Sequence, residues 1–182
     1  DRDADAFTTF RYDSADPKSL GSDTVRALFE DAEKRLWIGT EEGGLCMYDR
    51  DARSFIRYRP NPAISGSLRG STVRAVSQDE TGKLWVGTEN SGINIFLPEE
   101  GVFRHEQETG DQKGLAGDRI RSLFVDHSGL LWIGTRDNGI SIYNPRSRDF
   151  SLLSTRNTAR QIFEDSGGIL WYGTDGGGLH GI

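Results

Sequence analysis

The sequence predicts an all-β protein, a β-propeller built of four four-stranded antiparallel blades. A stretch of strand formers around a glycine-rich turn occurs four times, and its tryptophans are spaced by 48, 47 and 39 residues. Repeats in the forties made only of short strands are typical of propeller blades. No stretch repeats apolar residues at helical spacing, which argues against helical repeats. The four copies span residues 36–48, 84–96, 131–143 and 170–182.

Each copy reads as a β-hairpin, as the third copy shows. Residues 131–133 (LWI) are strand formers, and the turn over residues 134–139 (GTRDNG) holds residues that can take positive φ. Ile140 and Ile142 then share one face of the returning strand, while Ser141 faces the other way. Because one hairpin is marginal in water, the copies are expected to stack against one another.

The first repeat sets the order of strands within a blade. Residues 24–30 are expected to form the innermost strand, 36–40 and 45–48 the hairpin, and 55–58 the outer strand. The blades are thus predicted at residues 24–58, 72–106, 119–153 and 159–182. The other predicted strands are 73–78, 84–88, 93–96, 102–106, 120–125, 131–135, 140–143, 150–153, 159–164, 170–174 and 179–182.

The fourth set is one strand short, and an unmatched stretch of the missing type, residues 7–12 (FTTFRY), lies near the N-terminus. We expect this N-terminal strand to complete the last blade, or the blades to continue into a larger ring made by further blades or by a second copy. The chain starts without Met, so we expect it to be a piece of a longer protein. Loops rich in Gly, Ser and Asp connect the blades at residues 13–23, 59–71 and 107–118. The fourth loop, 154–158, is shorter, which predicts an asymmetric opening on that face.

Composition excludes several classes of protein. The formal net charge is −6 over 182 residues, which argues against a nucleic-acid partner, because such binding needs many Lys and Arg contacts with phosphate. Cys46 is the single cysteine, so no intramolecular disulfide can form. There is no signal peptide and no apolar run near ~20 residues. We therefore expect a membrane connection only through parts of the protein outside this sequence.

The repeated stretch, VRALFEDAEKRLWIGTEEGGLCMY in the first copy and IRSLFVDHSGLLWIGTRDNGISIY in the third, resembles the two-component regulator propeller repeat. That family supplies sensory regions of bacterial membrane-bound histidine kinases, hybrid regulators and diguanylate cyclases. The resemblance runs over residues 7–182 and implies a propeller facing the periplasm, with a membrane helix and a signalling module elsewhere. The family usually has seven blades in a ring, so four repeats are a departure from its pattern.

One arginine occupies the second position of the innermost strand in every repeat. In a propeller this position lies near the mouth of the central channel, where converging guanidiniums could bind a carboxylate, a sulfate or an acidic sugar. The alternative is that each arginine pairs with an acid of its own or the adjacent blade. Glu41, Glu89, Asp137 and Asp175, in or beside the Gly-Thr turns, are expected on the same face. The candidate ligand-binding arginines are Arg26, Arg74, Arg121 and Arg160.

Two further residue types recur in every repeat, and we expect both to be structural. An aspartate begins the turn after the innermost strand, where a carboxylate can accept backbone N–H groups; a calcium site would need six to eight oxygens in one place. A tryptophan follows in the next strand, where packing between blades is favoured over stacking on a sugar. The residues are Asp31, Asp79, Asp126 and Asp165, and Trp37, Trp85, Trp132 and Trp171.

The sequence holds no enzyme signature. His105, His127 and His180 have no metal-ligand spacing, and no nucleophile elbow or phosphate loop occurs, so we expect no cofactor and no metal. The first hypothesis is a non-enzymatic sensory module that binds a small polar ligand, for example a carbohydrate fragment. The second is a propeller lyase or glycoside hydrolase, which would need two facing carboxyl groups roughly 5–10 Å apart. The third is a purely structural module that contacts neighbouring blades or a second copy of the chain.

Overall fold

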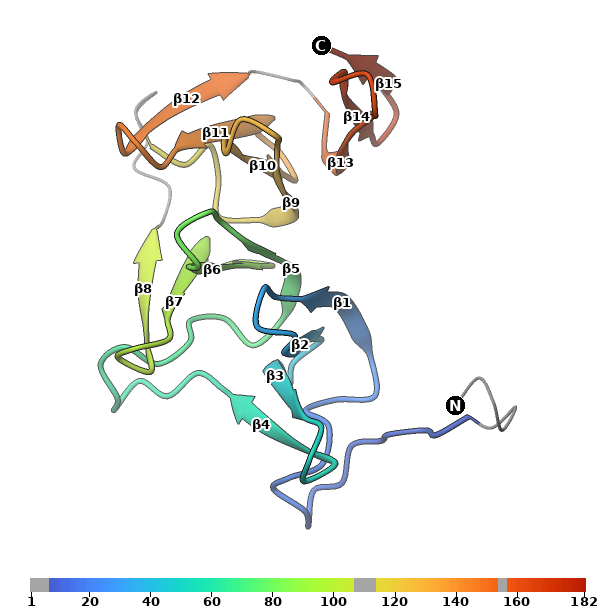
Figure 1. Ribbon diagram of the computed structural model, residues 1–182, viewed down its shortest axis with the longest axis vertical. Coiled ribbons are helices and arrows are strands. Elements are labelled where there is room, and N and C mark those ends of the chain that lie inside the picture. The colour runs from blue at the N-terminus through green and yellow to red at the C-terminus, as the bar shows by residue number, and fades with distance from the viewer. Residues whose placement is uncertain (1–6, 107–113, 154–156) are drawn as a thin grey trace.

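The computed structural model describes residues 7–106, 114–153 and 157–182, and within these ranges it contains strands and no helices (Figure 1). The strands form four antiparallel sheets, in which sequence neighbours pair with one another. The first sheet is β1 (Val25–Glu30), β2 (Leu36–Thr40), β3 (Gly44–Asp49) and β4 (Ser54–Tyr58); the second is β5 (Val73–Gln78), β6 (Leu84–Thr88), β7 (Ile93–Leu97) and β8 (Val102–Glu106). The third is β9 (Ile120–Val125), β10 (Leu131–Thr135), β11 (Ile140–Asn144) and β12 (Asp149–Leu153); the fourth is β13 (Ala159–Glu164), β14 (Leu170–Thr174) and β15 (Gly178–Gly181).

The Gly-Thr turn is closed in the same way in every repeat. In the first sheet, the Thr40 hydroxyl donates a hydrogen bond of 2.8 Å to the carbonyl of Gly44, which has a φ of +79°. A Cβ at Gly44 would lie 2.3 Å from the carbonyl oxygen of Tyr58, so only glycine fits there. The equivalent bonds join Thr88 to Gly92, Thr135 to Gly139 and Thr174 to Gly178 at 2.8–2.9 Å.

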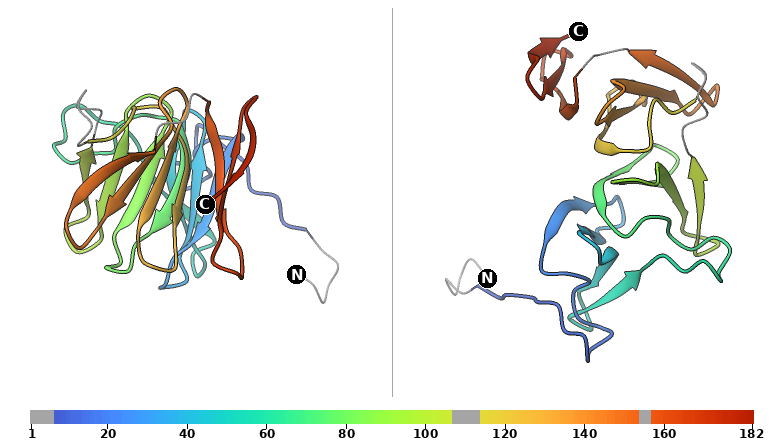
Figure 2. Two further views of the ribbon diagram at one scale, coloured as in Figure 1. Left: turned by 90° about the horizontal axis from the view of Figure 1, so that it is seen from above. Right: turned by 180° about the vertical axis from the view of Figure 1, so that it is seen from behind.

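The four sheets follow one another along an arc, with β1, β5, β9 and β13 on its inner side and the outer strands β4, β8 and β12 on the other (Figure 1). Seen from above, the sheets stand side by side (Figure 2). The apolar cores lie between the sheets. The first core joins Trp37 and Leu45 to Val73 and Leu84 of the second sheet, and similar clusters lie between the second and third sheets and between the third and fourth. The all-β class and the four propeller blades are thus confirmed.

The first and last sheets each have one uncovered face. Leu28 on β1 is 68% exposed, whereas its equivalent Val76 on β5 is 8% exposed because the first sheet covers it. At the other end Phe163 is 57% and Leu179 is 68% exposed, although Ile93, which is equivalent to Leu179, is fully buried. The apolar side chains that would face a further sheet are therefore present at both ends of the arc.

The expectation that residues 7–12 form a strand that completes the fourth blade is wrong. The fourth sheet has three strands, and residues 7–12 have no strand conformation. Phe10 instead packs on Tyr48 and Phe55 of the first sheet, with ring centroids 5.2 and 5.3 Å apart, and Asp23 accepts the backbone N–H of Tyr12. The larger ring stays a prediction.

Two of the predicted connecting loops lie partly outside the described residues, namely 107–118 at residues 107–113 and 154–158 at residues 154–156. Among the residues that are described, none form a helix long and apolar enough to cross a membrane.

Candidate functional site

The repeated arginines lie at β-bulges on the inner side of the arc. In the first sheet, Val25 pairs with Thr40 and Ala27 with Gly39, so Arg26 is the extra residue between them. The same shift of register occurs around Arg74, Arg121 and Arg160. A bulge bends its strand and redirects a side chain. Each arginine is thereby directed toward a turn that carries an acid.

Three of these arginines pair with the acid that follows the Gly-Thr of their own sheet. The Arg26 Nε lies 2.9 Å from Glu41, the Arg160 Nη2 lies 2.6 Å from Asp175, and Arg74 forms a short ion pair with Glu89. The Arg26 and Arg160 pairs are well exposed to water, so each contributes little to stability. The guanidiniums thus have acidic partners before any ligand is considered.

The third repeat departs from this pattern. The position that holds Glu41, Glu89 and Asp175 in the other repeats is Arg136 here, and Asp137 comes one residue later and pairs with Arg119 at 3.4 Å. Arg121 therefore lacks an acid at the equivalent place in its own sheet. The sequence-based alternative allows each arginine an acid of its own or of the adjacent blade, and Arg121 uses the adjacent one.

Arg121 instead reaches across to Glu89 of the second sheet. Its Nη1 and Nη2 each lie 2.8 Å from a carboxylate oxygen, a bidentate pair, and the Arg136 Nη1 lies 3.7 Å from Oε1. The Glu89 side chain is 17% exposed and that of Arg121 is 12% exposed. Burial alone would raise the pKa of Glu89, but hydrogen bonds from Arg74 and Arg121 outweigh it and hold the pKa below its usual value. Glu89 therefore joins the second and third sheets.

The repeated aspartates and tryptophans form one hydrogen-bonded unit. In the second sheet Asp79 Oδ1 accepts the backbone N–H groups of Thr81 and Lys83, while Oδ2 accepts the indole N–H of Trp85 at 2.8 Å. The same carboxylate–indole bond, 2.7–2.8 Å long, occurs in the other three sheets. Each aspartate thus fixes both its turn and the ring beside it.

This bond also affects the charge of the aspartates. Burial opposes ionisation of Asp31 and Asp126, but hydrogen bonds, led by those from Trp37 and Trp132, hold both pKa values below the usual range. The pKa of the exposed Asp165 is lowered mainly by the indole of Trp171. These carboxylates therefore accept hydrogen bonds from backbone and indole N–H groups of their own repeat.

The histidines lie in three separate places. His105 on β8 bonds to the carbonyl of Ser67, His127 pairs with Glu164 of the next sheet, and the His180 ring stacks on Tyr172 with centroids 4.7 Å apart. Within the described ranges, no group of three or more His, Cys, Asp or Glu side chains could hold a metal ion.

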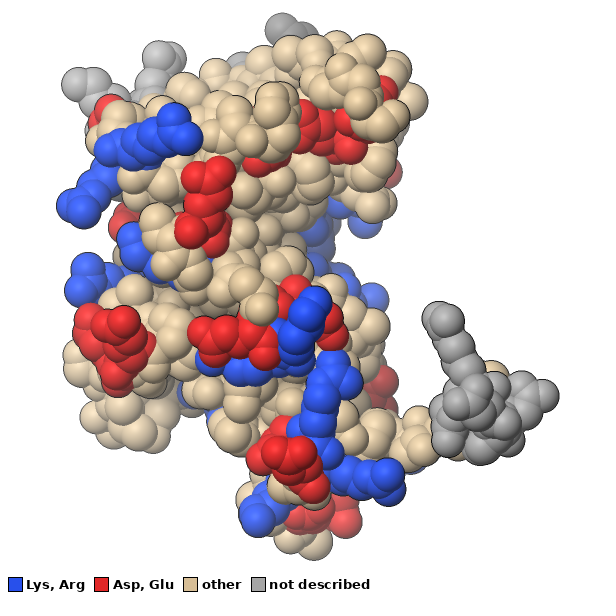
Figure 3. Space-filling model, in the orientation of Figure 1, with Lys and Arg blue, Asp and Glu red and all other residues tan. Residues whose placement is uncertain are grey.

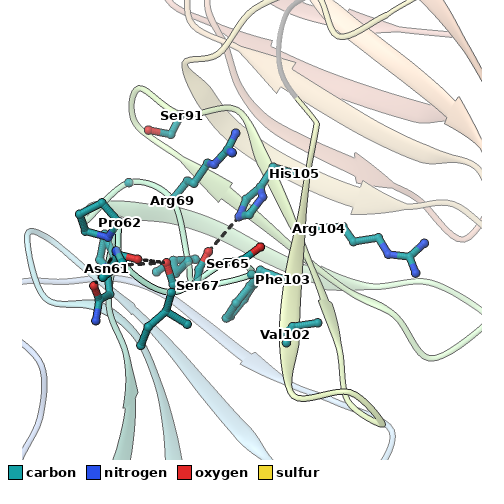
Figure 4. A pocket seen from close by; sticks show the side chains of 16 residues that line it. Asn61, Pro62, Ser65, Ser67, Arg69, Ser91, Val102, Phe103, Arg104 and His105 are labelled. Carbon is teal, nitrogen blue, oxygen red and sulfur yellow. Dashed lines mark hydrogen bonds between the residues drawn. The ribbon is translucent and has the colours of Figure 1, made fainter.

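A hollow of about 1120 Å³ lies at the outer edge of the second sheet, away from the repeated arginines. We call it the loop hollow, because the connecting loop at residues 60–70 forms one side of it, with Ser91 and residues 102–105 around the rest. Figure 4 shows Arg69 and His105 next to each other on its border, while the Arg104 side chain points away from the loop. From the sequence, ligand binding is expected on the face built by the long loops and the Gly-Thr turns, but neither Arg69 nor His105 is a predicted binding residue.

Charged side chains of both signs are mixed on the face of the arc seen in Figure 3. No broad area of a single sign covers that face. The charge distribution on this face therefore does not indicate a binding site.

Comparisons with known proteins find a family model that matches three of the repeats. Three stretches of the chain, residues 19–42, 67–90 and 114–137, match the family model described as "Two component regulator propeller". Each stretch contains the end of a connecting loop, the inner strand with its arginine, the aspartate turn and the Gly-Thr strand. No curated protein matches the chain.

Among solved structures, the chain is similar to extracellular domains of two proteins of B. thetaiotaomicron described as hybrid two component systems. The first is 22% identical with a TM-score of 0.73, over 98% of this chain and 29% of that one. The second is 24% identical with a TM-score of 0.77, over 94% of this chain and 24% of that one. A virginiamycin B lyase of Staphylococcus aureus shares the fold at 17% identity and a TM-score of 0.61, over 87% of this chain and 55% of the lyase. The chain thus spans less than a third of the two extracellular domains.

Proposed function

We propose that the chain is a non-enzymatic sensory region of a bacterial signalling receptor, because three of its stretches match the model of the two component regulator propeller family. The observation that carries the proposal is the match of three repeats to that family. The likeness of nearly the whole chain to the extracellular domains of hybrid two component systems supports it and favours an extracytoplasmic location. In this role the propeller binds a small polar ligand, such as a carbohydrate fragment, and passes occupancy to the rest of the receptor.

The pairing of acids on the inner side of the arc supports a non-enzymatic role. A glycoside hydrolase or lyase of the propeller type would need two facing carboxyl groups that are free to act on a substrate. Here Glu41, Glu89 and Asp175 are each held by at least one arginine. A low pKa, as at Glu89, also makes a carboxylate a poor general acid at neutral pH.

The uncovered apolar faces at the two ends of the arc support contacts with further blades. Leu28 at one end, and Phe163 and Leu179 at the other, have the character of the side chains that are buried between the inner sheets. We propose that neighbouring blades of the same receptor cover these faces, and that a second copy of the chain is the alternative. Such coverage would link ligand binding in one blade to the position of the next.

A ligand screen tests the sensory role. Thermal-shift and calorimetric titrations of the chain with sugars, sugar acids and other small metabolites should find a ligand that binds saturably and is recovered unchanged. A receptor from which residues 19–182 are deleted should then lose its transcriptional response to that ligand. Conversion of the ligand into a product would contradict the proposal, and so would an unchanged response of the deleted receptor.

A further inference from the structure

The first and second connecting loops have the same backbone framework. In the first loop, Ser19 Oγ accepts the N–H of Asp13 at 2.7 Å, and in the second, Ser67 Oγ accepts the N–H of Asn61 at 3.1 Å. Each loop also lies against the outer strand of the following sheet. The N–H of Phe55 bonds to Lys18 and that of Phe103 to Gly66, at 2.8 and 2.7 Å. Residues 13–23 and 61–71 can therefore be compared position by position.

The first difference concerns the side chain that faces each loop from the outer strand. In the first sheet, Arg57 donates from Nε to the Ser19 carbonyl at 2.5 Å and from Nη2 to the Asp16 carbonyl at 2.8 Å. Its guanidinium also lies 5.5 Å from the ring of Tyr12. In the second sheet, His105 takes this position, and among the described residues its hydrogen-bond partner is the Ser67 carbonyl, at 2.9 Å. The shorter imidazole leaves the loop hollow where Arg57 occupies the space in the first sheet.

The second difference is Arg69, which stands where the first loop has Gly21. A Cβ at Gly21 would lie 2.8 Å from both the Cys46 Sγ and the Gly43 carbonyl, so the first loop has no room for a side chain there. In the second sheet Asn94 replaces Cys46 and holds Arg69 by its backbone, accepting its N–H at 2.7 Å and donating to its carbonyl at 3.1 Å. The Arg69 side chain borders the hollow, and the described residues give its guanidinium no ion pair.

The third difference is charge. Asn61 and Ile64 take the places of Asp13 and Asp16, so two carboxylates of the first loop are absent from the second. Among the residues that the structure describes, those lining the hollow include no Asp or Glu, although the chain as a whole has a net charge of −6. What the lining does offer is the Arg69 cation, His105 and the hydroxyls of Ser65 and Ser91 (Figure 4).

From these three differences we infer that the loop hollow is a binding site for a small hydroxylated organic anion. Arg69 supplies the charge-assisted hydrogen bonds to the anionic group. Because a carbonyl only accepts, His105 Nε2 carries the proton toward Ser67, which leaves Nδ1 to accept a ligand hydroxyl. The inference deepens the proposed sensory function and rests on it for its physiological role. The binding itself can be measured without any signalling.

The test is isothermal calorimetry of the chain with three anionic probes, D-glucuronate, citrate and inorganic sulfate, and with D-glucose as the uncharged control. We expect saturable binding of at least one hydroxylated anion and affinity at least about tenfold lower for D-glucose, because the sugar lacks the charged partner for Arg69. Sulfate, which has charge but no hydroxyl, should bind more weakly than the best organic anion. If none of the three anions binds, or if D-glucose binds as well as D-glucuronate, the inference is overturned.

Three variants locate the site. Arg69→Ala should lower the affinity by about tenfold or more, since one charged hydrogen-bonding group is lost. Arg53→Ala, which removes an equal charge from the exposed turn between β3 and β4 of the first sheet, should leave the affinity within about twofold. His105→Arg should abolish binding although it adds charge, because it fills the hollow as Arg57 does in the first sheet.

Thermal unfolding of each variant guards against loss of fold, and Arg69→Ala alone decides the matter if His105→Arg does not fold. Anion binding that Arg69→Ala leaves unchanged would refute the site while leaving the sensory proposal intact. The receptor-deletion experiment described above judges that proposal by itself.

Discussion

The second and fourth sheets carry the same repeat, but they differ in what surrounds it. Both have the carboxylate–indole bond at 2.8 Å and the same Thr-to-Gly bond at 2.9 Å. However, Trp85 is 1% exposed whereas Trp171 is only partly buried. A Cβ at Gly87 would lie 2.4 Å from Ile120 of the third sheet, whereas a Cβ at Gly173 would meet nothing within 4 Å. Hydrogen bonding is thus local to a repeat, while burial is supplied by the next sheet.

This comparison explains why the units are stable only as an array. A repeat that binds its own polar groups still leaves one apolar face that its neighbour has to cover, which makes stability approximately a sum of units and interfaces. The same substitution should therefore have a large effect in the second sheet and a small one in the fourth. We expect this difference between the covered and the uncovered sheet to be largest at the tryptophans.

The largest contrast is expected at the tryptophans. Trp85→Ala should lower the free energy of unfolding by about 3–5 kcal/mol, because it leaves a cavity between two sheets and removes the indole bond to Asp79 Oδ2. Trp171→Ala should cost about half as much, because the ring is already partly in water. Guanidinium unfolding followed by circular dichroism measures both. Equal losses would mean that the fourth sheet is covered in solution.

The glycines before the repeated threonines Thr88 and Thr174 test the close approach of the sheets. Gly87→Ala should destabilise the chain by about 1–3 kcal/mol, because its methyl group overlaps with Ile120. Gly173→Ala, the matched control, should stay within about 0.5 kcal/mol of the original. In the full receptor, Gly173→Ala should become as harmful as Gly87→Ala if another blade covers β14. A neutral Gly87→Ala would contradict the packing described for these sheets.

Glu89 offers a test at the inner side of the arc. Glu89→Gln removes the anion shared by Arg74, Arg121 and Arg136, and should cost about 1–3 kcal/mol, since charged hydrogen bonds at a mostly buried site are lost. Glu41→Gln breaks a single pair that is 37% exposed on both sides and should cost less than about 1 kcal/mol. Thermal denaturation of both variants gives the comparison. A larger loss for Glu41→Gln would show that Glu89 does not link the second and third sheets.

The smallest effect is the pH dependence of stability. The pKa values of Glu89 and Asp126 are lowered in the folded protein, so their stabilisation is complete above the unfolded pKa of about 4 and is lost as pH falls through the folded values. Stability should thus fall on acidification below about pH 4–5. Asp126→Asn should flatten that acid limb, as measured by urea unfolding between pH 7 and 3. An unchanged slope would mean that Asp126 does not contribute to it.

Much of the fold could be predicted from the sequence, because each strand and turn is specified within its own repeat. The hairpins that contain Trp37 and Trp132 can be predicted from the alternation of apolar and polar residues and from the Gly-Thr turns. The role of residues 7–12 could not be predicted in this way, because it depends on contacts of Phe10 with Tyr48 and Phe55 rather than on strand propensity. The carboxylate–indole bond was also missed, since partners six residues apart meet only after the turn has formed.

The candidate site was less predictable, because sequence repeats identify the residues that recur, whereas the site is formed by residues that differ between repeats. Arg136 directly follows Thr135, as Glu89 follows Thr88, so the sequence alone shows that Arg136, not Asp137, is equivalent to Glu89. The changes at Arg69 and His105 are equally visible in aligned repeats. Their convergence on one hollow is not, because residues 36 positions apart become neighbours only through the docking of the loop on β8.

We infer that the shared residues build the arc, whereas the ligand binds where the second repeat differs. Chemical-shift mapping of backbone amides during titration with the best of the three anions tests this most directly. We expect shifts at residues 61–70 and 102–105, and none at the equivalent residues 13–22 and 54–57. Shifts centred instead on Arg26, Arg74, Arg121 and Arg160, at the inner side of the arc, would contradict it.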